Sequence, residues 1–93
     1  MAQKEARRIN VIIREMIADM RNICNNQKTP TTWREKYWAA APYINALLDC
    51  ETVNDQYGAD SAKILIAYLL GNLSGYKGDK AKALKKELKD LIK

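Results

Sequence analysis

The chain of 93 residues contains no histidine and no phenylalanine, and it has only two cysteines, two prolines and four glycines. Without histidine the protein lacks the commonest general base near neutral pH, the commonest metal ligand and any Ser–His or Cys–His nucleophile pair. This absence removes most enzyme hypotheses, so we predict a protein that is not an enzyme and needs no cofactor or metal. The aromatic bulk must come from two tryptophans and five tyrosines.

Long apolar runs are also missing from the sequence. No stretch reaches the ~18 residues that a membrane span needs, and the charged N-terminus lacks the apolar centre of a signal peptide. We therefore expect a cytoplasmic protein without a membrane partner. In that compartment Cys24 and Cys50 are predicted to be buried free thiols, with a disulfide between them as the alternative.

The apolar residues recur at spacings of three and four, and no alternating strand pattern is found. We predict one all-α domain over residues 1–93, a four-helix arrangement with helices at about 3–24, 33–50, 60–73 and 79–93. The second helix should be kinked at Pro42, or divided into two short coaxial helices, because proline removes a backbone donor and clashes with the preceding turn. Residues 51–59 form the one sizeable loop in this scheme.

Local signals mark the expected helix ends. Thr32 and Glu35 form a capping-box pattern, Asp60 or Ser61 should cap the third helix, and Asp79 should cap the fourth. Gly75 suits the left-handed position that follows a helix, and the next residue, Tyr76, suits the hydrophobic contact that accompanies it.

The last third of the chain joins two different helices. The segment from Asp60 to Leu70 is apolar on almost every side, so we expect protein to surround it at the centre of the bundle. The segment from Asp79 to Lys93 places its leucines on one face. The opposite face carries a lysine ridge that must meet water or an anion, formed by Lys82, Lys85, Lys86, Lys89 and Lys93.

Positive charge is concentrated at the two ends. Residues 1–28 carry six basic and three acidic groups and residues 76–93 carry seven and three, whereas residues 29–75 carry three basic and five acidic groups. Arg7, Arg14 and Arg21 are seven residues apart and should form a row on one flank of the first helix. These arginines, together with Lys82, Lys85, Lys86 and Lys89, are candidate contacts for phosphates or an acidic protein patch. A solvated face is the alternative for each row.

Three further hypotheses concern aromatic, DNA-binding and metal-binding residues. Trp38 is a candidate binding anchor, the alternative being that it covers the kink at Pro42. A helix-turn-helix is disfavoured, because the connector 74–79 is long and the last helix begins without base-reading residues. The spacing of Asp49, Glu51, Asp55 and Asp60 does not match a calcium-binding loop.

Several short patterns, spread over residues 33–90, resemble those of small proteins encoded by phages and prophages of Gram-positive bacteria. They are Trp33-Arg34-x-x-Tyr37-Trp38, Pro42-Tyr43-Ile44, Tyr57-Gly58-x-Asp60-Ser61, Tyr68-Leu69-Leu70-x-Asn72 and Tyr76-Lys77-Gly78-Asp79-x-Ala81-Lys82-x-x-Lys85-x-Glu87-Leu88. The family pattern has Trp-Arg-Gly-Glu at the last turn, where this chain has Tyr76, Lys77, Gly78 and Asp79. The resemblance implies a small phage accessory protein and carries no catalytic residue.

The leading hypothesis is a non-enzymatic phage accessory protein that binds and inhibits a host protein or protein–nucleic-acid complex. An anti-CRISPR inhibitor of a Cas effector is the example that the resemblance favours. The second hypothesis is a basic DNA- or RNA-binding phage regulator that contacts phosphates without sequence preference. The third is a homodimeric structural module that uses Val11 and exposed aromatic residues as its seam.

Overall fold

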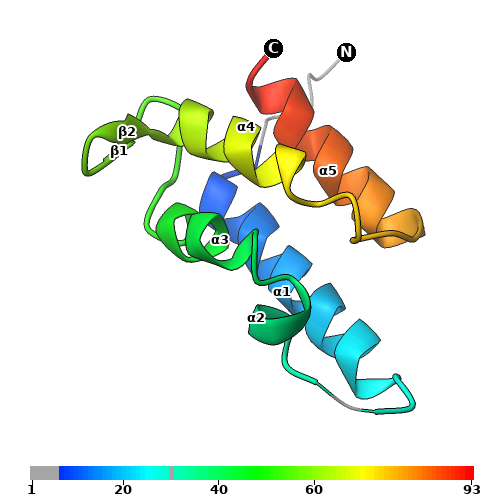
Figure 1. Ribbon diagram of the computed structural model, residues 1–93. Coiled ribbons are helices and arrows are strands. Elements are labelled where there is room, and N and C mark those ends of the chain that lie inside the picture. The colour runs from blue at the N-terminus through cyan, green and yellow to red at the C-terminus, as the bar shows by residue number, and fades with distance from the viewer. Residues whose placement is uncertain (1–6, 30) are drawn as a thin grey trace, which may run out of the picture.

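The computed structural model describes residues 7–29 and 31–93, and these ranges are mostly helical (Figure 1). They form α1 (Ile9–Asn25), α2 (Trp33–Lys36), α3 (Ala41–Leu47), β1 (Gln56–Tyr57), β2 (Asp60–Ser61), α4 (Ala62–Gly71) and α5 (Asp79–Leu91). The helical class agrees with the sequence analysis. The arrangement differs, because the described residues contain five helices instead of four and a small antiparallel sheet.

Helix α1 packs against α5 on one side and against α2 and α3 on another (Figure 1). Its buried face consists of Ile9, Ile12, Ile13, Met16, Met20 and Cys24. The helix begins at Ile9; residues 3–6 of the predicted helix lie outside the described ranges. Ile9 N–H donates to the carbonyl of Glu51 at 2.9 Å and Asn10 N–H to that of Cys50 at 3.1 Å. The loop after α3 therefore supplies acceptors for the free donors of the first turn of α1.

Two short helices, α2 and α3, occupy the segment where a kinked helix or two short coaxial helices were expected. The hydroxyl of Thr32 accepts from Glu35 N–H at 3.2 Å, which confirms the predicted cap. The Glu35 carboxylate does not complete the box and instead accepts from the hydroxyl of Thr31 at 3.1 Å. Pro42 lies in the first turn of α3. A proline is well tolerated there because the first-turn N–H groups have no intrahelical partner.

The expected loop at 51–59 contains a small hairpin. Gln56 pairs with Ser61 and Tyr57 with Asp60, across a turn in which Gly58 has φ of 64°. Strands of two residues are too short to produce a recognisable alternation, which is why the sequence pattern missed them. After the hairpin, the hydroxyl of Ser61 accepts from Ile64 N–H at 3.3 Å, as predicted for the start of the next helix.

The connector between α4 and α5 differs from the expected cap geometry. The left-handed glycine is Gly78, with φ of 119°, and the backbone of Gly75 is not left-handed. Asp79 is the first residue of α5, and no side-chain cap precedes this helix. Its carboxylate still lies at the positive end of the helix dipole, where negative charge is favourable.

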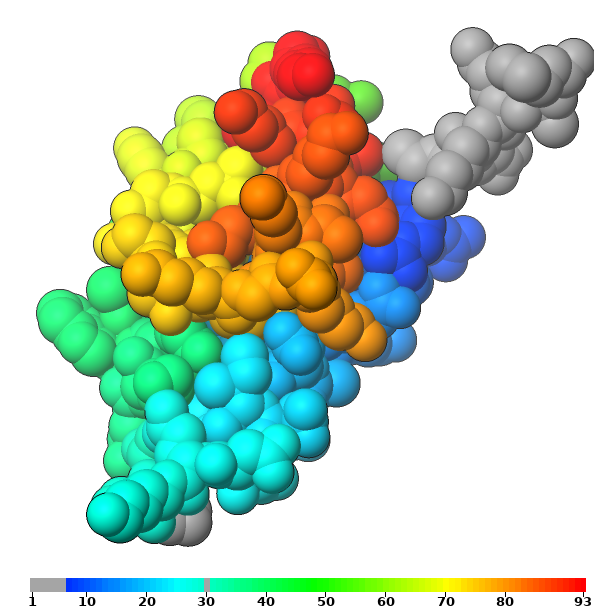
Figure 2. Space-filling model, turned by 90° about the vertical axis from the view of Figure 1, so that its right-hand side faces the viewer, coloured from blue at the N-terminus to red at the C-terminus, as the bar shows by residue number. Residues whose placement is uncertain are grey.

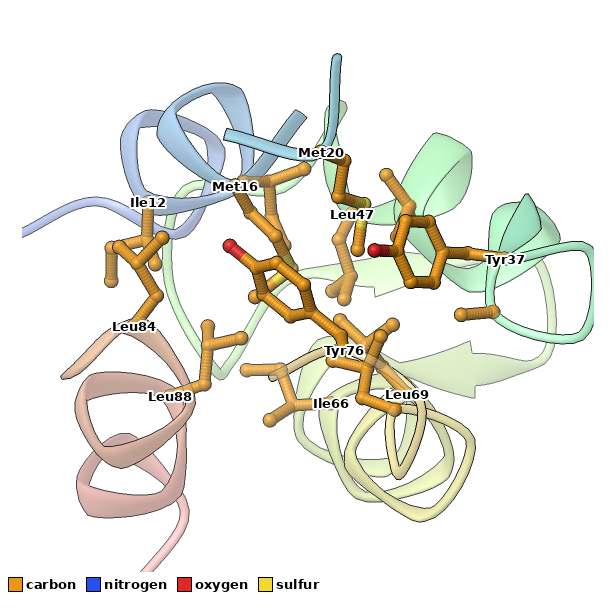
Figure 3. Packing of buried hydrophobic residues seen from close by; sticks show 14 of the residues in the cluster. Ile12, Met16, Met20, Tyr37, Leu47, Ile66, Leu69, Tyr76, Leu84 and Leu88 are labelled. Carbon is orange, nitrogen blue, oxygen red and sulfur yellow. The ribbon is translucent and has the colours of Figure 1, made fainter. Parts of the chain in front are cut away.

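Tyr76 lies at the centre of the core, between residues of α1, α4 and α5 (Figure 3). Its ring is 0% exposed and makes an edge-to-face contact with Tyr37 at a centroid distance of 5.7 Å. Its hydroxyl donates to Oδ2 of Asp19 in α1 at 2.6 Å. Burial and this hydrogen bond raise the pKa of Tyr76 well above its usual range. The residue expected only as a helix-end contact therefore joins three helices.

Cys24 and Cys50 are buried free thiols, as the sequence analysis predicted. Cys50 Sγ–H donates to the carbonyl of Ala46 at 3.7 Å, and burial raises the pKa of this thiol. Both side chains act as small apolar groups of the core.

Candidate functional site

Arg7 is held by other residues of the chain and does not stand free for a partner. Its guanidinium donates from Nε and Nη2 to the carboxylate of Glu87 at 2.8 and 2.7 Å, and Nη1 pairs with Glu15. The hydrogen bonds to Glu87, then those to Glu15, raise the pKa of Arg7 above its usual value. The bidentate geometry joins the start of α1 to α5. Arg7 therefore has a structural role within the chain, and its contact with an external anion stays a prediction.

Arg14 and Arg21 are exposed, on the side of α1 that faces away from α5. The side facing α5 is marked by Asp19, which binds Tyr76, and by Ile12, which points toward Leu84 (Figure 3). At 3.6 residues per turn, the two arginines lie roughly 140–180° round the helix from these two residues. The arginine row and the lysine ridge therefore do not form one anion-facing surface. Arg21 instead lines a shallow hollow with Thr32 and Arg34.

Lys85 also has a structural role. Its Nζ donates to the carbonyl of Leu73 at 2.7 Å and lies 5.8 Å from the centre of the Tyr76 ring. The same carbonyl accepts from Tyr76 N–H at 3.0 Å, so Lys85 completes the turn that buries this tyrosine. Lys85 is therefore engaged within the chain, and its external contact stays a prediction. Lys93 pairs with Asp90 at 3.4 Å on the exposed surface.

The other three lysines of the ridge, Lys82, Lys86 and Lys89, are exposed along α5. Together with Lys85 they form one wall of a shallow groove between α4 and α5, whose apolar lining consists of Ala67, Leu70, Gly71 and Ile92. Figure 2 shows the end of α4 (yellow) beside α5 (orange to red) on the surface of the molecule. No ion pair of these three lysines occurs among residues 7–29 and 31–93. Their charges are therefore presented to the solvent next to an apolar strip.

Helix α4 is not surrounded by protein, contrary to the expectation for a helix that is apolar on every side. Ala62, Leu65, Ile66 and Leu69 are buried, but Ile64 is 43% and Tyr68 is 51% exposed. Tyr68 has one aromatic neighbour, the half-buried Tyr43 of α3, at a centroid distance of 5.7 Å. We define the α4–α5 face as Ile64, Ala67, Tyr68 and Gly71 of α4 with Lys82, Lys86 and Lys89 of α5. Sequence reasoning identified its lysines and missed its apolar half.

Trp38 lies in the turn between α2 and α3 and is 75% exposed. Only about a quarter of the side chain is covered, which leaves little of it to pack on the start of α3 at Pro42 or on the loop 51–59. A tryptophan this exposed is available to a partner and contributes little to the core. It stays a candidate anchor, separate from the α4–α5 face as defined above.

The described acidic groups have local structural partners or face the solvent. The carboxylate of Asp55 accepts from the N–H groups of Glu51 and Thr52 at 2.7 and 3.2 Å, and these bonds lower the pKa of Asp55. No group of three or more potential metal ligands occurs in the described part of the chain.

Comparison with known proteins found no matching family model, no matching curated protein and no matching solved structure. Among the described residues, no helix has both the length and the apolar character required to cross a membrane. A function is therefore inferred from the surface chemistry of this chain.

Proposed function

We propose that the protein is a non-enzymatic accessory protein that binds an acidic surface of a host protein or protein–nucleic-acid complex through the α4–α5 face. The observation that carries the proposal is the position of Ile64 and Tyr68. These large side chains are about half exposed on a helix whose only charged residue is Lys63. Exposed apolar side chains beside unpaired charges of one sign are typical of a binding surface.

The resemblance to small phage and prophage proteins supports a more particular form of this proposal. In that form the protein is an inhibitor that a phage delivers against host machinery, and an anti-CRISPR inhibitor of a Cas effector is the leading example. Its site of action would be the host cytoplasm. An inhibitor needs no chemistry of its own, because occupying a functional surface of its target is sufficient.

A nucleic-acid partner is the second candidate, and the specific observation in its favour is the row of exposed Lys82, Lys86 and Lys89. Lysines of this kind contact phosphates without reading sequence. The apolar half of the face favours a protein instead, because a phosphate backbone offers Ile64 and Tyr68 nothing to pack against. A protein partner therefore accounts for more of the surface.

Affinity capture from a phage-sensitive host tests this proposal when three forms of the protein are compared. The wild type should retain one stoichiometric partner. The variant K86E/K89E should lose it by at least tenfold, because like charges would then meet across the interface. The matched control R14E/R21E changes net charge equally, on the side of α1 that faces away from α5, and should retain the partner. Equal capture by all three forms would overturn the proposal.

Direct measurement distinguishes the second candidate. Binding to a labelled DNA or RNA duplex should be weak, and lost at physiological salt, if the partner is a protein. A shift at low micromolar protein that falls steeply with salt and disappears in K86E/K89E would establish nucleic acid as the ligand instead. A stable dimer in sedimentation, together with no captured partner, would favour the homodimeric module.

A further inference from the structure

Gly71, which has no side chain, lines the groove between α4 and α5. Ala67 precedes it by one helical turn on the same side of α4, and both residues line the groove. The backbone of Gly71 is not left-handed, and a Cβ placed on it would meet nothing within 4 Å. The fold therefore does not require a glycine at this position. Its small size leaves open space above α4, where another backbone can approach closely.

The length and shape of this space suit a helix better than a strand. Helices α4 and α5 have 10 and 13 residues, which corresponds to lengths of about 15 and 20 Å. A groove of this length accommodates roughly three or four turns of an added helix. A strand needs an exposed sheet edge for pairing. The described chain has only the short hairpin of β1 and β2, which does not line this groove.

The lysines of α5 indicate which charge a bound helix should carry on its flank. Lys82, Lys86 and Lys89 have the spacing i, i+4, i+7, so they lie on one side of α5 over about two turns. Carboxylates at the same spacing on an added helix would each face one lysine. The apolar side of that helix would cover Ala67 and Gly71 and reach Ile64 and Tyr68. A second copy of this chain is a poor occupant, because its net charge is +5.

We propose that the α4–α5 groove binds one amphipathic α-helix of the partner protein, with a row of Asp or Glu residues beside its apolar stripe. This inference rests on the proposed function and specifies the part of the partner that is recognised. The acidic row pairs with Lys82, Lys86 and Lys89, and the apolar stripe packs over Gly71. Helix-in-groove recognition of this kind is driven by anchors at i, i+3, i+4 and i+7.

The test uses the intact protein and a displayed library of peptides of about 18 residues, long enough for five helical turns. Each member has an apolar stripe and randomised flanks, and a second library carries a central proline that breaks the helix. Selection should enrich helical members with Asp or Glu on one flank. No enrichment, equal enrichment of the proline library, or enrichment of basic flanks would overturn the inference.

Two glycine variants locate the site. Gly71→Leu should fill the groove and weaken an enriched peptide at least tenfold. Gly75→Leu is the matched control, because its backbone is also not left-handed, a Cβ there also meets nothing within 4 Å, and it does not line the groove. Both variants should unfold at the same denaturant concentration as the wild type to within the error of the measurement. Unchanged peptide affinity in Gly71→Leu would contradict the proposed location.

Two further probes separate this inference from the proposed function. Vesicles containing phosphatidylglycerol and a DNA duplex should not compete with the enriched peptide, and competition that Gly71→Leu removes would assign the groove to lipid or nucleic acid. Capture of a host protein that depends on Lys86 and Lys89 and is unaffected by Gly71→Leu would leave the proposed function in place. The helical occupant would then be wrong.

Discussion

The two flanks of α5 differ in how their charges are satisfied. On the flank toward α1, Glu87 is held by Arg7, and the neighbouring buried surface contains Tyr76 with its hydroxyl bound to Asp19. On the flank toward α4, Lys82, Lys86 and Lys89 have no described acidic partner, and the apolar residues beside them are partly exposed. The first flank is completed by the chain itself. The second has no such partners among the described residues, and this difference separates residues that stabilise the fold from residues whose charges remain exposed.

The largest expected effect is on the flank that the chain completes. Tyr76→Ala should lower the free energy of unfolding by about 3–5 kcal/mol, because it leaves a cavity between three helices. Tyr68→Ala removes the same side chain from the open flank and should cost less than about 1 kcal/mol while weakening partner capture. Urea denaturation of the two variants measures the contrast. Equal destabilisation would show that the two flanks do not differ in this way.

The raised pKa of Tyr76 predicts a loss of stability at alkaline pH. The unfolded tyrosine ionises near its ordinary pKa of 10.0, whereas the folded one stays neutral well above it. The folded state therefore holds a proton that the unfolded state has released, so this contribution is present below pH 10 and falls as the pH rises further. At pH 11 the loss from this group should be roughly 1.4 kcal/mol. Urea midpoints at pH 9 and pH 11 should differ less in Tyr76→Phe than in the wild type.

Lys85 and Lys86 are adjacent in the sequence, but Lys85 is hydrogen-bonded within the fold and Lys86 is exposed. Lys85→Met removes the hydrogen bond to Leu73 and should cost about 1 kcal/mol, since that carbonyl retains only the N–H of Tyr76. Lys86→Met should leave stability within about 0.5 kcal/mol of the wild type. Thermal unfolding measures the loss of stability in Lys85→Met. Partner capture should be weakened by Lys86→Met. A loss of stability in Lys86→Met larger than about 0.5 kcal/mol would show that Lys86 also has a structural role.

The smallest expected difference concerns the arginines. Arg7→Gln should lower the free energy of unfolding by about 0.5–1 kcal/mol at low salt, because the pair with Glu87 is partly exposed. The difference from wild type should shrink as ionic strength rises. Arg14→Gln, on the exposed side of α1, should show neither effect. Denaturation at low and high salt tests both variants, and a salt-independent loss in Arg7→Gln would mean that packing is the cause.

Sequence patterns within a few neighbouring residues predicted much of the secondary structure. The apolar stripe of α1, the cap at Thr32 and the cap at Ser61 each depend on residues within a few positions of one another, and all three are present. The sequence left open whether Pro42 bends one helix or lies at the start of a second, because a proline is compatible with both positions, and the structure places it in the first turn of α3. The hairpin was missed because two paired residues on each strand leave no period to detect.

The candidate site was predicted only in part, for a related reason. Seven-residue spacing placed Arg7, Arg14 and Arg21 in one row, and only the packing of α1 on α5 brought Arg7 within reach of Glu87. Lys85 could not be separated from its neighbours in the ridge, because its acceptor, Leu73, is 12 residues away in the chain. Ile64 and Tyr68 were expected in the core because they belong to an apolar helix. Such a helix needs a covering surface, but its sequence does not show whether the same chain or another molecule supplies that surface.

By itself, the sequence determined that the chain is mainly helical and lacks the histidine chemistry of many enzymes, and that it carries a lysine row on its last helix. These properties follow from composition and from the helical period, which are local. Only the tertiary structure decided which charges are satisfied internally, and that one side of α4 stays exposed near three lysines without an ion pair in the described ranges 7–29 and 31–93. That decision depends on contacts between residues far apart in the chain, and sequence spacing contains no information about those distances.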